Sequence, residues 1–191
     1  MKLNPKFNYP KSIRAYYNGQ RLYDVNNEKL PSVTTILSFT KSKEDKESLE
    51  RWRKKVGTAA AEKITREATS RGSAMHDFLE KFLLGKLNLD LLGDNSLERQ
   101  MADQIIENGL RNRVNEIFGV EVCLFYPHRY AGAADLICEY EGKLSVVDFK
   151  NSNQLRSDQW NTDYYLQLSA YQMAHNKVYG TDINQGVILV C

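Results

Sequence analysis

The chain has 191 residues, 42% hydrophobic and 26% charged, and a formal net charge of +2, from 26 Lys plus Arg against 24 Asp plus Glu. This composition fits one globular domain over residues 1–191 and excludes a membrane-spanning protein, because no apolar run approaches the ~20 residues of a membrane span. The N-terminal stretch has no apolar signal-peptide core and only weak transit-peptide character, so we expect a soluble protein of the cytoplasm.

The first 23 residues are basic and rich in aromatic side chains, with five Lys or Arg and no Asp or Glu. The segment "RAYYNGQRLYDV" predicts a β-hairpin that turns at Asn18 and Gly19, and "RWRKK" at residues 51–55 adds more basic residues and a Trp. Cations bind phosphates and flat rings stack on unpaired bases, so these stretches fit single-stranded nucleic acid. Taken alone, they are explained more simply by a solvated helix face and a Tyr-rich hairpin.

Three helices are expected after the hairpin. A charged helix over about 43–56 and an amphipathic helix over about 60–84 each stop at a glycine. The second helix carries apolar residues at i, i+3, i+4, i+7 and i+8 from Met75, which predicts one buried face. A third helix is predicted over about 96–118, ending at Gly119.

The remaining pattern predicts three strands, a helix and a last strand, over about 120–125, 133–140, 144–149, 162–178 and 186–190. The order from residue 96 onward is therefore αβββαβ. We expect an α/β fold with a catalytic core over residues 96–191 and an N-terminal hairpin and helical extension over residues 1–95.

The three cysteines, Cys123, Cys138 and Cys191, are an odd number without C-x-x-C spacing. They predict neither a disulfide framework nor a zinc or iron–sulfur cluster. We interpret them as small core residues.

Charged residues stand at unusual places in the strand pair "AGAADLICEYEGKLSVVDFK", residues 131–150. If the two strands are neighbours, Asp135 and Asp148 project to one place, and Lys150 points to the same face. Two adjacent carboxylates repel unless a cation lies between them, and hard oxygen ligands of this kind suit Mg²⁺ or Mn²⁺. The simpler alternative is an Asp-Lys surface pair on an edge strand, which contributes little energy. The apolar surroundings of Asp148 favour the metal site.

These residues carry a resemblance to a known family. Asp135, followed after twelve residues by Asp148-Phe149-Lys150, resembles the signature of the PD-(D/E)XK nucleases, whose restriction-endonuclease-like αβββαβ core has a central mixed sheet flanked by helices. The stretches "LPSVTTIL", "LERWRKK", "RGSAMHDFLE" and "QLSAY" resemble the RecB-like branch, and most closely the mitochondrial genome maintenance exonuclease group with its phage and bacterial relatives. The resemblance covers about residues 30–191.

The resemblance implies a role for each matching residue. His76, Asp135, Asp148 and the backbone carbonyl of Phe149 would bind Mg²⁺ or Mn²⁺, and Lys150 would orient the attacking water and stabilise the transition state. A lone His is otherwise usually structural, and the "HDFLE" context favours the ligand. Glu80, four residues after His76 on the same helix face, would either hold the imidazole or be a solvated helix charge.

Further residues are expected to position the substrate. Gln167 and Tyr171 lie one helical turn apart and match the Q-x-x-x-Y element of the branch, although Tyr171 also fits a packing stripe. The residues expected to contact DNA are Arg51, Trp52, Arg53, Arg71 and Ser152. The family often has Thr where this chain has Asn151. Relatives also continue past the last strand, so we expect a truncation at Cys191.

The resemblance implies a monomeric, metal-dependent exonuclease of a bacterial or phage-infected cell. Its substrate would be single-stranded DNA or flaps with a free end, in DNA replication, repair or recombination, because the upstream helices can roof the site and admit one strand. Protein partners are not predicted. The alternatives are a catalytically silent DNA-binding protein on the same fold and a restriction-type or CRISPR-adaptation endonuclease. The last kind generally holds an iron–sulfur cluster with an early cysteine, and no cysteine precedes Cys123 here.

Overall fold

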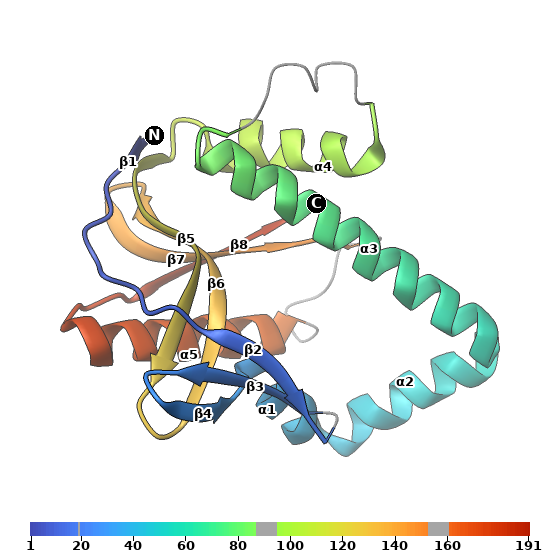
Figure 1. Ribbon diagram of the computed structural model, residues 1–191. Coiled ribbons are helices and arrows are strands. Elements are labelled where there is room, and N and C mark those ends of the chain that lie inside the picture. Colours follow the sequence, from blue (N-terminus) through green and yellow to red (C-terminus); the bar gives the residue numbers. More distant parts are fainter. Residues whose placement is uncertain (19, 87–94, 153–160) are drawn as a thin grey trace.

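The structure, a computed structural model, describes residues 1–18, 20–86, 95–152 and 161–191 (Figure 1). The first part of the chain forms short strands followed by helices, and the segment from residue 96 onward has the predicted αβββαβ order. The elements are β1 (Lys2–Leu3), β2 (Ile13–Tyr17), β3 (Gln20–Val25), β4 (Glu28–Pro31), α1 (Val33–Thr40), α2 (Lys43–Val56), α3 (Thr58–Leu83), α4 (Leu97–Ile105), the π-turn Ile106–Leu110, β5 (Val114–Tyr126), β6 (Tyr130–Tyr140), β7 (Lys143–Lys150), α5 (Thr162–Tyr179) and β8 (Gln185–Val190).

A five-stranded mixed sheet forms the centre of the molecule, in the order β1-β5-β6-β7-β8. Strands β5, β6 and β7 run antiparallel, whereas β1 pairs with β5 and β8 with β7 in parallel. Helix α5 covers one face of the sheet, and α3 and α4 cover the other (Figure 1). This arrangement confirms the expected mixed sheet flanked by helices.

The sheet has a hydrophobic core on each face because successive side chains of a strand point in opposite directions. Leu136 and Val147 pack under α3 and α4, while their neighbours Ile137 and Val146 pack against α1 and α5. Strands that are covered on both faces read as continuous apolar runs, as in "DLIC" and "LSVV". A charged residue in such a run therefore points into one of the two covered faces of the sheet, where it is shielded from bulk water.

The predicted N-terminal hairpin is present as β2 and β3, and β4 extends it to a separate three-stranded sheet. The pairing of Tyr17 with Gln20 puts the turn at the expected place, although Gly19 itself lies outside the described residues. This small sheet packs on the central one through a buried cluster of Tyr23, Val25, Leu30, Cys123, Phe125 and Ala131. The hairpin is thereby fixed beside β6.

The prediction of one helix over residues 96–118 was wrong in its second half. The helix passes into the π-turn after Ile105, Asn112 adopts a positive φ of 61°, and β5 begins at Val114. The hydroxyl of Tyr140 donates a hydrogen bond to the carbonyl of Gly109 at 2.9 Å, in line with this turn. The apolar residues after it bury themselves in the sheet, so tertiary packing outweighs the helical pattern.

Helices α2 and α3 extend away from the sheet as two arms of a V (Figure 1). Helix α2 begins at the cap Ser42, contains no buried residue, and ends at Gly57, whose φ of 87° reverses the chain. Helix α3 then returns for 26 residues, and its second half packs on the core of the central sheet through Met75, Leu79 and Leu83. Among the described helices, none is long and apolar enough to cross a membrane.

Candidate active site

Three acidic residues stand on three adjacent strands of the central sheet. Strand β5 pairs Val120 with Leu136 and Val122 with Ala134, so Glu121 falls opposite Asp135 of β6. On the other side, Leu136 pairs with Val147, which places Asp148 of β7 next to Asp135. Asp135 and Asp148 are buried, with 8% and 2% of their surface exposed. The expected meeting of the two aspartates is therefore present, with a third acid beside them.

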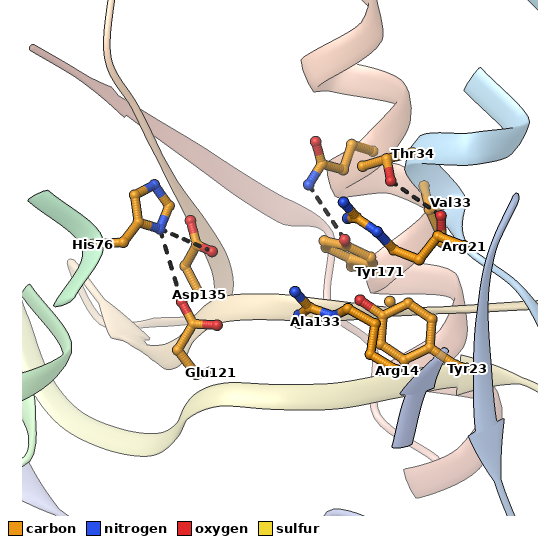
Figure 2. A pocket seen from close by; sticks show the side chains of 13 residues that line it. Arg14, Arg21, Tyr23, Val33, Thr34, His76, Glu121, Ala133, Asp135 and Tyr171 are labelled. Carbon is orange, nitrogen blue, oxygen red and sulfur yellow. Dashed lines mark hydrogen bonds and ion pairs between the residues drawn. The ribbon is translucent and has the colours of Figure 1, made fainter. Parts of the chain in front are cut away.

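Helix α3 brings His76 to these acids. Its Nδ1 lies 3.6 Å from Asp135 Oδ1 and 3.8 Å from Glu121 Oε1, and its Nε2 lies 3.1 Å from the carbonyl oxygen of Phe149 (Figure 2). The helix approaches closely because residue 72 is glycine: a Cβ there would lie 2.8 Å from Asn151 Oδ1. His76 is thus placed by contacts to the end of β7.

Asn151 takes part in the same helix contact. Its side-chain amide donates a hydrogen bond to the carbonyl of Ala68, on α3, at 3.1 Å. The residue at which this chain departs from the expected Thr thus ties the segment after Lys150 to the helix that carries His76.

The charges at this site are in conflict without a cation. Burial, followed by the charge of Asp148, raises the pKa of Asp135 to about 7. Burial also raises the pKa of Asp148, against the opposing effect of Lys150. For His76, burial would lower the pKa, but the carboxylates of Glu121 and Asp135 outweigh it and hold the pKa above its ordinary value. A positive ion between these groups would relieve this electrostatic cost.

Lys150, Gln167 and Tyr171 form a second group of contacts around Asp148. Lys150 makes an ion pair with Asp148 Oδ2, and its Nζ lies 5.1 Å from the centre of the Tyr164 ring. Gln167 donates from Nε2 to Asp148 Oδ1 at 3.2 Å and to the hydroxyl of Tyr171 at 3.3 Å. The Tyr171 ring packs so tightly on Gly132 that a Cβ there would lie 2.7 Å from it. Helix α5 is thereby fixed against the strand that carries Asp135.

A cavity of about 200 Å³ opens beside the acids. Figure 2 shows His76, Asp135 and Glu121 on one side of it and the hairpin arginines with Tyr171 on the other. The cavity also has the N-cap of α1 in its wall: Ser32 Oγ accepts a hydrogen bond from the backbone N–H of Thr35 at 3.0 Å. The "LPSVTTIL" stretch therefore forms a helix start that faces the acids.

The donor set fits a divalent metal ion. Among the described residues, His76, Glu121 and Asp135 offer one ligand atom each, all within 4.8 Å of one another. Carboxylate oxygens suit Mg²⁺ and Mn²⁺, and an imidazole moves the preference towards Mn²⁺. The carbonyl of Phe149, which was expected as a ligand, lies 3.1 Å from His76 Nε2, and the Phe149 N–H donates to Asp135 Oδ2 at 2.7 Å. Its role as a ligand stays a prediction. Asp148 is adjacent and is engaged by Lys150 and Gln167.

Comparison of the sequence with known proteins identifies the family of this chain. The sequence profile of the PD-(D/E)XK nuclease superfamily matches residues 36–190. The chain belongs to that superfamily. It is also similar to proteins named mitochondrial genome maintenance exonuclease 1: 29% identical to the human protein over 169 residues, 33% to the mouse protein over 172, and 30% to that of Xenopus tropicalis over 175.

These matches cover 84–86% of the present chain but only 48–49% of each relative, so the chain spans about half the length of the curated relatives it matches. Membership of the nuclease superfamily supports a nuclease role for this chain, and together with the donor set of His76, Glu121 and Asp135 it supports a divalent metal. The resemblance inferred from the sequence motifs is confirmed at the level of the family.

Glu121 is the residue of this PD-(D/E)XK nuclease that sequence reasoning missed. It lies in a strand at a positive φ of 50°, a conformation that costs a residue with a side chain about 1–3 kcal/mol. Backbone strain of this kind gathers at functional sites, where the surrounding structure maintains it. The available signal was an acid between two valines in "VEV", inside the expected strand over residues 120–125, whose other residues are apolar.

The other predicted residues lie on α2, on α3 and directly after β7. Glu80 is half-buried one turn beyond His76, while the carboxylates near the imidazole belong to Glu121 and Asp135. Arg51 and Arg53 are exposed on α2 and Trp52 is half-buried there, and Arg71 is half-buried on α3. Ser152 donates its backbone N–H to the carbonyl of Cys191 at 2.8 Å. The roles expected for Glu80 and for the DNA contacts stay predictions.

Proposed function

We propose that this chain is a metal-dependent deoxyribonuclease that hydrolyses single-stranded DNA or flaps from a free end, in DNA replication, repair or recombination. The observation that carries the proposal is the convergence of His76, Asp135 and Glu121 with the Asp148-Lys150 pair. An imidazole, three carboxylates and an ammonium group in one place can hold a divalent cation and a phosphate together. We propose Mn²⁺ or Mg²⁺ as the ion.

Each of these residues has a task in the hydrolysis. When bound, a divalent cation polarises the phosphoryl oxygen and lowers the pKa of a coordinated water. His76, Asp135 and Glu121 would hold it, while the N–H of Phe149 keeps one oxygen of Asp135 turned into the strand. Gln167 keeps Asp148 oriented.

Lys150 supplies positive charge where negative charge develops on the phosphate, and it can donate a hydrogen bond to the attacking water. Water attacks phosphorus, one P–O ester bond breaks, and the leaving oxygen takes a proton.

Single-stranded DNA is the substrate that the surroundings favour. Arg14 and Arg21 of the hairpin line the cavity opposite the acids, so cationic groups lie where a DNA phosphate beside the metal would need them. The cavity is small, about 200 Å³, and is enclosed by the hairpin, α1 and α5. A single strand can bring one phosphate into it, whereas a duplex is ~20 Å wide. Helix α2 also carries exposed basic residues, among them Arg51 and Arg53.

End-labelled oligonucleotides test the proposal. With Mn²⁺ or Mg²⁺ present, linear single strands should be degraded, while a circular single strand and a blunt duplex of the same sequence should stay intact. Blocking the 5′ or the 3′ end in turn gives the polarity. Asp148→Asn keeps the size of the side chain and an oxygen for Gln167, and it should reduce cleavage at least about a thousandfold because it removes the negative charge beside the proposed metal ligands and the ion-pair partner of Lys150.

Thermal unfolding of Asp148→Asn controls for its fold. Cutting of the circle at the rate of the linear strand would contradict digestion from an end. Near-wild-type cleavage by folded Asp148→Asn would contradict the proposed site itself.

A further inference from the structure

A second cavity, of about 380 Å³, lies between the hairpin and α1. It is continuous in its lining with the cavity at the acids, because Arg21 and Thr34 belong to both. Its volume is at the lower end of the ~300–1,000 Å³ that small-ligand sites span. The lining residues are Tyr16, Asn18, Gln20, Arg21, Thr34, Thr35, Ser38 and Phe39.

Two aromatic rings stand exposed at this second cavity. Tyr16 has 68% and Phe39 has 65% of its surface open to solvent, so neither ring contributes much to the hydrophobic core. Tyr16 is nevertheless held in place: Arg21 donates to its hydroxyl from Nε at 3.3 Å and from Nη2 at 3.2 Å, and the guanidinium carbon lies 5.7 Å from the ring centre. An exposed ring that is already ordered suits stacking, because binding then costs little side-chain entropy.

The chemistry of the lining matches one nucleotide. The described residues around the cavity include no Asp or Glu that would repel a phosphate, and Arg21 is a cation shared with the cavity at the acids. The hydroxyls of Thr34, Thr35 and Ser38 and the amides of Asn18 and Gln20 supply donors and acceptors for a base edge. Stacking on an aromatic ring tolerates every base, as a nuclease without sequence preference requires.

We propose that the second cavity is a nucleobase subsite, in which Tyr16 and Phe39 hold a base of the single-stranded DNA while Arg21 binds the phosphate that leads to the acids. The proposal rests on the proposed function, since it assigns to the same substrate a place beyond the metal site. The strand would thus pass from the acids across the hairpin, and the hairpin would determine how many nucleotides are bound.

Tyr17 provides a matched control. It is the next residue on β2, it has the same 68% exposure as Tyr16, and it lines neither cavity. Neighbouring residues of a strand point to opposite faces, so truncating either ring removes the same amount of exposed surface on different sides of the hairpin. Both substitutions are expected to leave the fold intact, because neither side chain is buried.

The first measurement is binding of a fluorescent oligothymidylate of about 15 nucleotides, within the ~4–16-nucleotide sites of single-strand-binding folds, without divalent metal so that no cleavage occurs. Tyr16→Ala and Phe39→Ala should each weaken binding about tenfold, Tyr16→Phe should bind almost as well as wild type, and Tyr17→Ala should be unchanged. Equal affinity of Tyr16→Ala and Tyr17→Ala would overturn the subsite.

Photo-crosslinking provides an independent test. An oligonucleotide that carries 5-iodouracil at each position in turn should crosslink to Tyr16 or Phe39 at one position and its neighbours. Crosslinks that map only to α2 or to Tyr17 would overturn the subsite. A chain that binds DNA as described but does not cut it would refute the proposed nuclease and leave the subsite standing. If the wild-type chain cuts DNA and the Tyr16→Ala variant binds DNA as tightly as wild type, the subsite alone is refuted.

Discussion

Two histidines in two regions of this molecule have opposite environments. His76 lies beside acids at the candidate active site, with 29% of its side chain exposed and both nitrogens near oxygen atoms that carry full or partial negative charge. His175, on α5, is fully buried among aromatic rings, with the rings of Phe7 and Tyr179 each 4.7 Å away. The sequence presents both as single histidines within predicted helices.

The partners of each ring explain the difference. Among the described residues, the hydrogen-bond partners of His175 are neutral hydroxyls, Tyr9 at Nε2 (3.1 Å) and Thr181 at Nδ1 (2.8 Å), and burial lowers its pKa to about 4. For His76, burial acts in the same direction, but Glu121 and Asp135 outweigh it and raise the pKa. A buried His with neutral partners is structural, whereas a His among carboxylates either carries a proton itself or shares the carboxylates with a metal ion. The identity of the residue alone determines neither outcome.

The largest effect is expected at His175 when the pH falls. Its ordinary pKa is 6.5 and its folded pKa is about 4, so the ring is neutral in both states above pH 6.5 and contributes no pH dependence there. Between these values protonation favours the unfolded chain, which removes up to roughly 3 kcal/mol of stability by pH 4. Urea unfolding of wild type and His175→Gln at pH 7 and pH 5 measures the difference.

The comparison with His175→Gln isolates this group, because the carboxylates with raised pKa values titrate in both proteins. Their effect has the opposite sign, since a raised carboxylate pKa favours the folded state as the pH falls. A stability difference between wild type and His175→Gln that does not change with pH would show that the ring is not held neutral.

The second prediction concerns His76, with an effect on function instead of on folding. His76→Gln removes an imidazole ligand and should weaken Mn²⁺ binding about ten- to hundredfold, measured by calorimetry on the intact chain. Without metal, the midpoint of urea unfolding of His76→Gln should stay close to that of wild type, because the ring is partly exposed and is not part of a hydrophobic core cluster. A large loss of stability with unchanged Mn²⁺ affinity would show that His76, like His175, has a structural role and does not bind the metal.

The smallest effect is expected at Glu121, where the backbone and the side chain can be separated. Glu121→Gly relieves the positive φ and should raise stability by about 1 kcal/mol, while Glu121→Gln keeps the strain and should not. Both should weaken Mn²⁺ binding, because both remove the carboxylate. If neither variant changed Mn²⁺ affinity, the strained residue would have no part in the metal site.

Local patterns predicted most of the elements and the two aspartates, because strands covered on both faces and capped helices leave clear signals in the sequence. The helix over 96–118 failed after Ile105, since the sheet offered its apolar residues a better burial than a helix did. Glu121 was missed because "VEV" reads as ordinary alternation until its partner strand is known. The proximity of Arg14 to the acids depends on how the hairpin packs on β6, which no local pattern encodes.

The cluster that fixes the hairpin to the central sheet joins Tyr23, Val25 and Leu30 to Cys123, Phe125 and Ala131, roughly one hundred residues later in the chain. Ribosomes add about 5–20 residues per second, so the hairpin's apolar face is made some 5–20 seconds before the surface that buries it. The β5-β6-β7 meander, by contrast, pairs residues close in sequence as soon as they emerge. During synthesis, the hairpin that lines both cavities is therefore among the first elements to be made, but it cannot pack on the central sheet until β5 and β6 have followed.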